Sequence, residues 1–237
     1  MPIRHNVVVQ VVGLAVAAGA LAYHHYFNRD AKVKRALRKV PRVRLGNFVA
    51  AAVVKVVGRL DYVGEPLVAP LSQRRCAYYE LTIEEWRSSG RSGRWVTLVR
   101  DAGGKDFTLR DGGSAALVRT AAAEISVHKD EHHTTGILDS PTPELVALLE
   151  QHGQQTTGML GFNRKLRFRE GVLEAGEHVA VCGAAVRSSG GLSQEAPGAA
   201  AGPSIEWVFD RRGETLLYVS DDPDALLKPR PGARARS

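Results

Sequence analysis

The chain has 237 residues, of which 44% are hydrophobic and 24% charged, a composition typical of a globular protein. Its two cysteines exclude a disulfide-rich scaffold and a four-cysteine zinc module within the chain. The net charge of +7 is concentrated at the ends, because residues 45–227 hold 19 basic and 24 acidic side chains. This charge balance argues against a nucleic-acid ligand for the middle of the chain.

The first 28 residues have the composition of a membrane anchor. The 21 residues from Val7 to Phe27 contain no formally charged side chain, and as a helix they would span about 31 Å, close to the hydrocarbon thickness of a bilayer. A cleaved signal peptide is one alternative, with Arg4 as its positive region and 20–22 as a small-residue cleavage site. A buried soluble helix is another. The basic segment that follows favours an uncleaved single-pass anchor over residues 1–28.

Residues 29–45 form a basic juxtamembrane segment. By the positive-inside rule it places the rest of the chain in the cytoplasm, at the inner membrane if the protein is bacterial. Export after cleavage is the alternative. The segment either contacts anionic lipid head groups or acts only as a stop-transfer flank. The residues expected to contact head groups are Lys32, Lys34, Arg35, Arg38 and Lys39.

The middle of the chain reads as short strands separated by glycine turns. Alternation and β-branched residues predict strands at 53–60, 76–83, 95–100, 107–110, 116–119, 178–186, 205–209 and 214–220. Turns are expected at 103–104 and 112–113, and a hairpin loop at 210–213 between the last two strands. Thr142 and Pro143 predict the start of a helix that ends near Gly153, and Asp222 the start of a short one.

These elements predict a mainly β chain with a few helices (α+β). We expect an N-terminal transmembrane helix followed by a small OB-like β barrel or sandwich with one inserted helix. The β-rich domain covers 46–227, with a flexible loop at 188–202 that is rich in Ser, Gly and Ala. Residues 228–237 are expected to be a disordered basic tail.

Three groups of residues in the β-rich part resemble the GIDE-type domain, also called the "beside a membrane" (BAM) domain. This family includes bacterial membrane proteins and the mitochondrial membrane-anchored RING ubiquitin ligase. The matching residues, which we expect to be structural, are Gly58, Pro70, Leu71, Ser72, Cys76, Tyr78, Tyr79, Glu80, Asp111, Gly113, Glu170, Gly176 and Gly183.

The resemblance implies a β domain next to a membrane helix. It does not imply ubiquitin transfer, because in the ligase that activity belongs to a RING with cysteine and histidine zinc ligands. This sequence has only Cys76 and Cys182. The mitochondrial relative places the domain in the intermembrane space, which opposes the cytoplasmic placement that the basic segment predicts.

The candidate sites are weak, and we assign no catalytic residue, metal ligand or cofactor. His128 and His132 could share a metal if their segment were helical, but the flanking residues favour a solvated loop. Cys76 and Cys182 are expected to be buried thiols that pair only if the domain is exported. Glu84 and Glu85 point to opposite faces of a strand, and we can place no titratable partner beside either.

Two further sets of acidic residues could serve either a functional or a structural role. Asp221, Asp222 and Asp224 could bind a cation or cap the short helix. Glu80 is a motif residue that a cryptic hydrolase could use. The leading hypothesis is therefore a single-pass membrane protein whose β-rich interaction domain lies next to the bilayer and binds an unidentified protein. The alternative is an accessory component of a membrane-bound ubiquitin-ligase-like or protease system, or a cryptic hydrolase.

Overall fold

A computed structural model describes residues 30–89, 92–121, 123–129, 131–134, 143–153, 165–192 and 205–227. The predicted anchor at 1–28, the predicted tail at 228–237 and most of the predicted loop at 188–202 lie outside these residues. Within the described part of the chain, no helix has the length and apolar character needed to cross a membrane.

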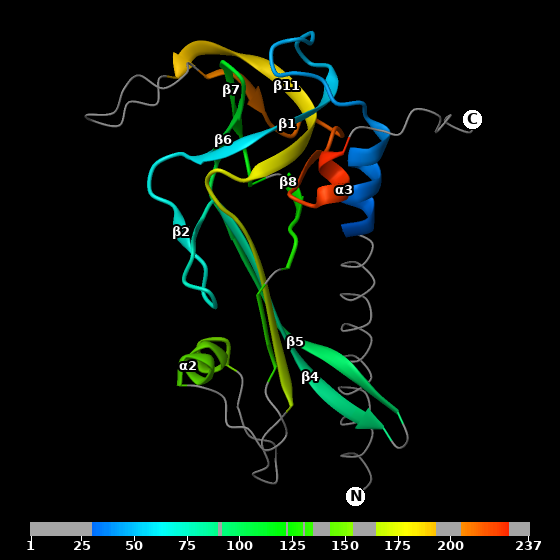
Figure 1. Cartoon of the computed structure of the whole chain (residues 1–237), viewed down its shortest axis with the longest axis vertical. Helices are drawn as coiled ribbons and strands as arrows, with labels where there is room; N and C mark the ends of the chain where they lie inside the picture. Colours follow the sequence, from blue (N-terminus) through cyan, green and yellow to red (C-terminus); the bar gives the residue numbers. More distant parts are fainter. Residues whose placement is uncertain are drawn as a thin grey trace, which may run out of the picture.

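The centre of the molecule is a closed β barrel. Its strands hydrogen-bond in the order β1 (Val53–Tyr62), β6 (Phe107–Asp111), β7 (Ser114–Val118), β12 (Ile205–Phe209) and β11 (His178–Leu192), and β11 returns to pair with β1. All neighbours are antiparallel except β7 and β12, which are parallel. The barrel confirms the prediction of a mainly β chain and gives its architecture as a closed barrel (Figure 1).

Alternating side chains of these strands fill the barrel. Val56, Leu60, Phe107, Leu109 and Phe209 are at most 1% exposed and belong to one apolar cluster. Strand β1 pairs with β11 up to Arg59 and with β6 from Arg59 onward, so it changes partner just after Gly58. A Cβ at Gly58 would lie 2.4 Å from the carbonyl oxygen of Arg110. Gly58 therefore lies within an unbroken strand, and its missing side chain allows β1 to pass close to the backbone of β6.

A second sheet projects from the barrel. Its strands lie in the order β5 (Ser92–Gly104), β4 (Tyr78–Ser89), β10 (Leu166–Leu173) and β9 (Glu131–Thr134). Figure 1 shows these strands extending along the long axis of the molecule, away from the barrel. The predicted helix is present as α2 (Pro143–Gln151), and its Leu148 and Leu149 pack on one face of this sheet against Leu81, Ile83 and Phe168. We call this second sheet the arm.

Several predicted connections differ from the structure. Strands β12 and β13 (Leu217–Ser220) do not form a hairpin around 210–213, because both pair with successive parts of β11. The glycines at 103–104 end β5 rather than forming the turn, and residues 188–192 continue β11. Strands β2 (Leu67–Val68), β9 and β10 were not predicted, and β8 (Ala123–Ser126) was expected only in part, from the strand-like residues 125–127. Strand β3 (Arg75–Cys76) is separated from β4 by Ala77.

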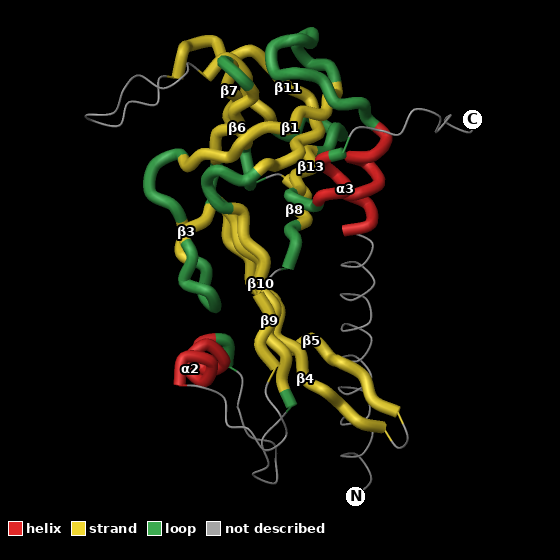
Figure 2. Tube along the Cα trace, in the orientation of Figure 1, coloured by secondary structure: helices red, strands yellow, loops and turns green. Residues whose placement is uncertain are grey.

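Two helical segments cover the outside of the barrel. Residues 30–39 form one helix, which we call helix 30–39, and α3 (Pro223–Leu226) is the predicted short helix after Asp222. The two lie side by side against the barrel in Figures 1 and 2. They meet at an apolar cluster that also contains Val57 of β1 and Cys182 of β11.

Candidate functional site

Helix 30–39 is fixed to the barrel by its apolar face. Val33 and Leu37 stand one helical turn apart and are both fully buried. They pack in the cluster with Val57, Ala180, Cys182 and Ala225. The segment that directly follows the predicted anchor is therefore part of the folded domain rather than a free linker.

Three of the five residues predicted to contact lipid head groups are paired with acids of the domain. The pairs are Lys32 with Glu124 at 2.8 Å, Lys34 with Asp222 at 2.5 Å and Arg38 with Asp224 at 2.5 Å. Arg35 and Lys39 are exposed and have no ion pair within the described residues. These two side chains present the free positive charge of helix 30–39.

The acids at the start of α3 cap the helix and hold the basic segment. Asp222 is its N-cap and accepts a hydrogen bond from the Asp224 backbone N–H at 2.9 Å. Burial acts to raise the pKa of Asp222, but the hydrogen bonds from Lys34 and from the backbone outweigh it and lower the pKa. Asp221 accepts a hydrogen bond from the His128 N–H at 2.8 Å. These contacts favour capping over cation binding.

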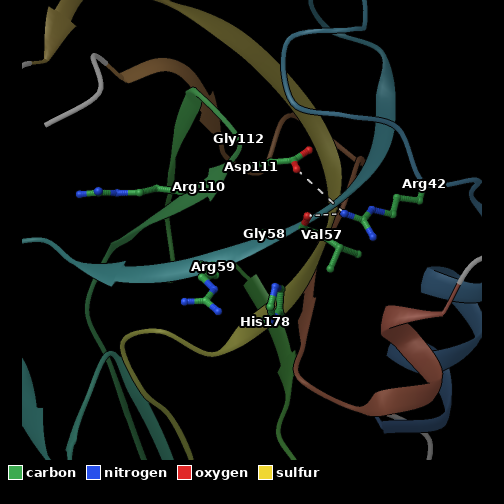
Figure 3. Close-up of a pocket in the computed structure, with 8 residues that line it drawn as sticks. All are labelled: Arg42, Val57, Gly58, Arg59, Arg110, Asp111, Gly112 and His178. Carbon is green, nitrogen blue, oxygen red and sulfur yellow. Dashed lines mark hydrogen bonds and ion pairs between the residues drawn. The ribbon is translucent and has the colours of Figure 1, made fainter.

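A hollow of about 360 Å³ opens on the barrel surface next to Arg42, just beyond helix 30–39 (Figure 3). Its floor is made by β1, β6 and β11 around Gly58. The lining residues are Arg42, Val57, Gly58, Arg59, Arg110, Asp111, Gly112 and His178. Asp111, one of the predicted motif residues, is the single acid in this lining and accepts a hydrogen bond from the Leu45 N–H at 3.0 Å.

Three basic side chains cross the floor of the hollow in one row. Arg59 is the register partner of His178 on one side and of Arg110 on the other, so the three lie on the same face of adjacent strands. Arg110 is paired with Asp61 at 2.8 Å. Arg59 and His178 have no acidic partner among the described residues. The hollow can therefore attract an anion, but it holds no nucleophile beside a base.

A second polar cluster lies on the arm, on the face opposite α2. Lys129 Nζ is 3.2 Å from Glu80 Oε1 and 3.0 Å from Thr82 Oγ1. Glu84 Oε2 is 2.7 Å from guanidinium nitrogens of both Arg167 and Arg169. The expectation that no titratable partner lies beside Glu84 is therefore wrong. Strand β10, which was not predicted, places Arg167 directly opposite Glu84.

The second cluster is closed to a substrate. Burial, together with the positive charge of Arg169, lowers the pKa of Lys129 to about 7. A lysine of this kind beside a hydroxyl group can act as a base. However, Thr82 is 2% exposed and Glu80 is 1% exposed. We therefore interpret the cluster as the polar interior of the arm.

Predicted motif residues from the loop before β4 and from β10 form one structural unit. Glu170 is fully buried on β10 and accepts hydrogen bonds from the Leu71 N–H at 2.8 Å, the Ser72 N–H at 2.9 Å and the Ser72 hydroxyl group. This carboxylate thereby fixes the loop that begins at Pro70. Two separate parts of the predicted motif thus come together in the structure.

The remaining motif residues are also structural. Tyr78 is buried in the barrel core, and the Tyr79 hydroxyl group donates to Asp101 at 3.2 Å. Burial, and secondly the charge of Asp101, raises the pKa of Tyr79. Gly176 has a φ of +89° in the turn between β10 and β11, a conformation that favours glycine. Gly183 lies within β11 opposite Val54, and Gly113 lies in the predicted turn between β6 and β7.

Cys76 and Cys182 are free and buried in separate apolar clusters. Burial raises the pKa of each thiol to about 11. Both therefore remain protonated and unreactive near neutral pH.

The histidine segment is extended rather than helical. His128 is exposed, and His132 lies in β9 as the register partner of Arg169. The helical spacing that could bring His128 and His132 to one metal is therefore absent, and residues 131–134 form a strand instead of the predicted loop. No group of His, Cys, Asp or Glu able to hold a metal occurs within the described residues.

Sequence reasoning missed the residues at the far end of the arm. Trp86 and Trp95 are register partners whose ring centroids lie 5.4 Å apart, and Arg167 stands 4.3 Å from the Trp95 ring centre. The available signal was the segment 86–95, in which two tryptophans enclose three arginines and no acid.

The comparisons with known proteins add no relative. No protein-family model, curated protein or solved structure matches the chain.

Proposed function

We propose that the protein is a membrane-anchored binding module whose β barrel is held next to the bilayer. The observation that carries this proposal is the burial of Val33 and Leu37 of helix 30–39 in the barrel surface. If residues 1–28 span the membrane, this docked helix leaves almost no free chain between the span and the barrel. The barrel then stays at the membrane surface instead of moving on a flexible tether.

The strand order supports the idea of a binding barrel. Numbered along the chain, the five barrel strands pair in the order 1-2-3-5-4-1, with the third and fifth parallel. We interpret this as an OB-type barrel, a Greek-key architecture that commonly serves binding. In this chain β4 and β5 of the arm are inserted between the first and second barrel strands, and β9, α2 and β10 between the third and fourth. The hydrogen bonds between Glu170 and Ser72 join these two insertions, which agrees with the proposed GIDE-type relationship.

The chemistry of the exposed surface favours an anionic ligand over catalysis. Arg59 provides positive charge on the floor of the hollow beside His178, and neither faces a nucleophile among the lining residues. In the Glu80–Lys129 pair, which the alternative of a cryptic hydrolase would use, Glu80 is buried and the Lys129 side chain is only 13% exposed. We therefore propose a protein partner with an acidic surface, met at the cytoplasmic side of the membrane.

The side of the membrane is tested by two reporter fusions placed after Ser237. One reporter is active only in the cytoplasm and the other only outside it, and both fusions are expressed in a bacterial host. The basic segment 29–45 outweighs Arg4 on the other side of the predicted span, so we expect activity of the cytoplasmic reporter alone. Activity of the external reporter alone contradicts this placement and supports an exported domain.

A further inference from the structure

The end of the arm carries a basic and aromatic hairpin that no part of the barrel covers. Within the described residues, the register of β10 with β4 ends at Glu85, and one more backbone hydrogen bond joins the Trp86 N–H to the Lys165 carbonyl oxygen. Beyond that point β4 and β5 continue as two strands, with Trp86 opposite Trp95 and Arg87 opposite Arg94. We call residues 86–89 and 92–95 the distal hairpin, which projects from the far end of the molecule in Figures 1 and 2. A two-stranded hairpin is only marginally stable alone, so a partner bound to this end of the sheet would stabilise it.

One face of the distal hairpin combines indole rings with cations. Trp86 and Trp95 meet edge to face, and Trp86 remains 37% exposed. Lys165 Nζ lies 5.8 Å and 5.9 Å from the two ring centres. An amphipathic ring next to a long basic side chain suits a boundary between water and an apolar medium.

The other face has unbalanced positive charge. Arg87 and Arg94 are directly opposite each other across the strands, an arrangement that destabilises a hairpin. Arg87 is compensated by Glu85 at 2.7 Å. Arg94 is exposed and has no acidic partner among the described residues. An anion bound from outside the chain would relieve this repulsion.

The ring geometry favours a bilayer over a nucleic acid. A base stacks on an open ring face, but the Trp86 ring is crowded by its own hairpin. A Cβ at Gly93 would lie 2.3 Å from the Trp86 ring, so this ring lies directly over Gly93. The Lys165 ammonium is near the ring as well. A ring crowded in this way suits burial among lipid head groups better than stacking on a base.

The orientation of the arm agrees with a membrane partner. In Figure 1 helix 30–39 (blue) runs roughly along the long axis of the molecule, and the distal hairpin extends below it. The exposed Arg35 and Lys39 of helix 30–39 add positive charge to this elongated shape. A domain lying with its long axis along the bilayer would bring both features to the head groups.

We propose that the distal hairpin binds the anionic surface of a phospholipid bilayer, with Trp86 and Trp95 at the interface and Arg87 and Arg94 on the phosphates. This inference rests on the proposed function, because it assumes that the anchor brings the domain to a membrane. It adds a second contact, which would fix the orientation of the domain on the bilayer.

The test measures tryptophan quenching in the full chain reconstituted into lipid nanodiscs. The discs contain phosphatidylglycerol and phosphatidylcholine, or phosphatidylcholine alone, with plain or brominated acyl chains. The chain has three tryptophans, and Trp207 is 4% exposed in the barrel and serves as an internal reference. We expect brominated anionic discs to quench the wild-type emission, and this quenching to be lost in W86F/W95F.

A charge-matched pair of variants separates the hairpin from general basicity. We expect R87S/R94S to lose the additional quenching in anionic discs, and R211S/R212S, which removes two exposed arginines far from the arm, to retain it. Equal emission in plain and brominated discs, with the chain incorporated, overturns the inference and leaves the proposed function standing. Quenching by a single-stranded oligonucleotide without lipid also overturns it. A chain that does not copurify with the discs contradicts the proposed function and the inference together.

Discussion

Gly58 and Gly113 both belong to the predicted motif, yet the structure gives them different roles. At Gly58 a side chain would collide with the backbone of β6, whereas at Gly113 a Cβ would meet nothing within 4 Å. From the sequence alone, both are glycines near strand ends, and nothing indicates which of them has no room for a side chain. Only the way in which β1 changes partner, from β11 to β6, makes Gly58 necessary.

We predict that Gly58→Ala lowers the free energy of unfolding by about 1–3 kcal/mol, because overpacking forces β1 away from β6. The matched variant Gly113→Ala should change it by less than about 0.5 kcal/mol. Urea denaturation of the detergent-solubilised chain, followed by tryptophan fluorescence, compares the two. Equal effects would show that β1 does not pass β6 as closely as described.

Asp221 provides a prediction on pH. Burial raises the pKa of Asp221 to about 6, although the hydrogen bond from the His128 N–H acts in the opposite direction. The folded state therefore holds this proton more tightly than the unfolded state, whose pKa is near 3.8. The resulting stability is fully present below pH 3.8 and is lost as the pH rises through about 6.

We expect Asp221→Asn to abolish this part of the pH dependence. The amide oxygen can still accept the hydrogen bond from His128, but it carries no charge. The variant should gain up to about 3 kcal/mol relative to wild type between pH 4 and pH 7. Urea midpoints measured across this range give the difference, and parallel curves for the two proteins would contradict the assignment.

Glu84 shows why the partners of a site residue could not be predicted from the sequence. The strand that contains it was predicted only as far as residue 83, but the placement of Glu84 and Glu85 on opposite faces was expected from the alternation of a strand. Its partners Arg167 and Arg169 come from β10, more than 80 residues later in the chain. Without a predicted β10 there was no basis for placing two guanidinium groups beside this carboxylate.

Elements with regular alternation were predicted well, and short or polar ones were not. The apolar runs of β1, β6, β11 and β12 identified the barrel strands. Strand β10 reads Leu-Arg-Phe-Arg-Glu, with its two arginines on one face and its glutamate on the other, and β9 is polar throughout. Both strands are stabilised by pairing with distant partners, which local patterns do not report.

Helix 30–39 is the element on which the proposed function depends. Its sequence was interpreted by its positive charge, but its apolar face determines its position. Leu37 is fully buried against the barrel, whereas Lys39 is exposed. The ion pairs of Lys32, Lys34 and Arg38 with domain acids reinforce this docking.

We predict that Leu37→Ala destabilises the folded domain by about 2–5 kcal/mol, because it leaves a cavity between helix 30–39 and β11. The control variant Lys39→Ala, on the exposed face of the same helix, should lower the free energy of unfolding by less than about 0.5 kcal/mol. Chemical denaturation again supplies the measurement. A Leu37→Ala variant as stable as wild type would indicate that helix 30–39 is not part of the folded unit.

At the scale of the whole molecule, the barrel and the arm have different roles in the proposal. The barrel carries helix 30–39 and the basic hollow, and the arm extends to a distal hairpin with free positive charge. An elongated shape of this kind can touch a bilayer at two separate places, which a compact barrel cannot do. The acidic balance of residues 45–227 is therefore less informative than the position of its few free cations.

The central claim is that residues 1–28 anchor the domain to a membrane, and alkaline carbonate extraction of membranes tests it most directly. Because carbonate removes peripheral proteins, the account predicts that the full chain stays in the membrane pellet while a chain lacking residues 2–28 is released. Recovery of the intact full-length chain in the carbonate supernatant would contradict it.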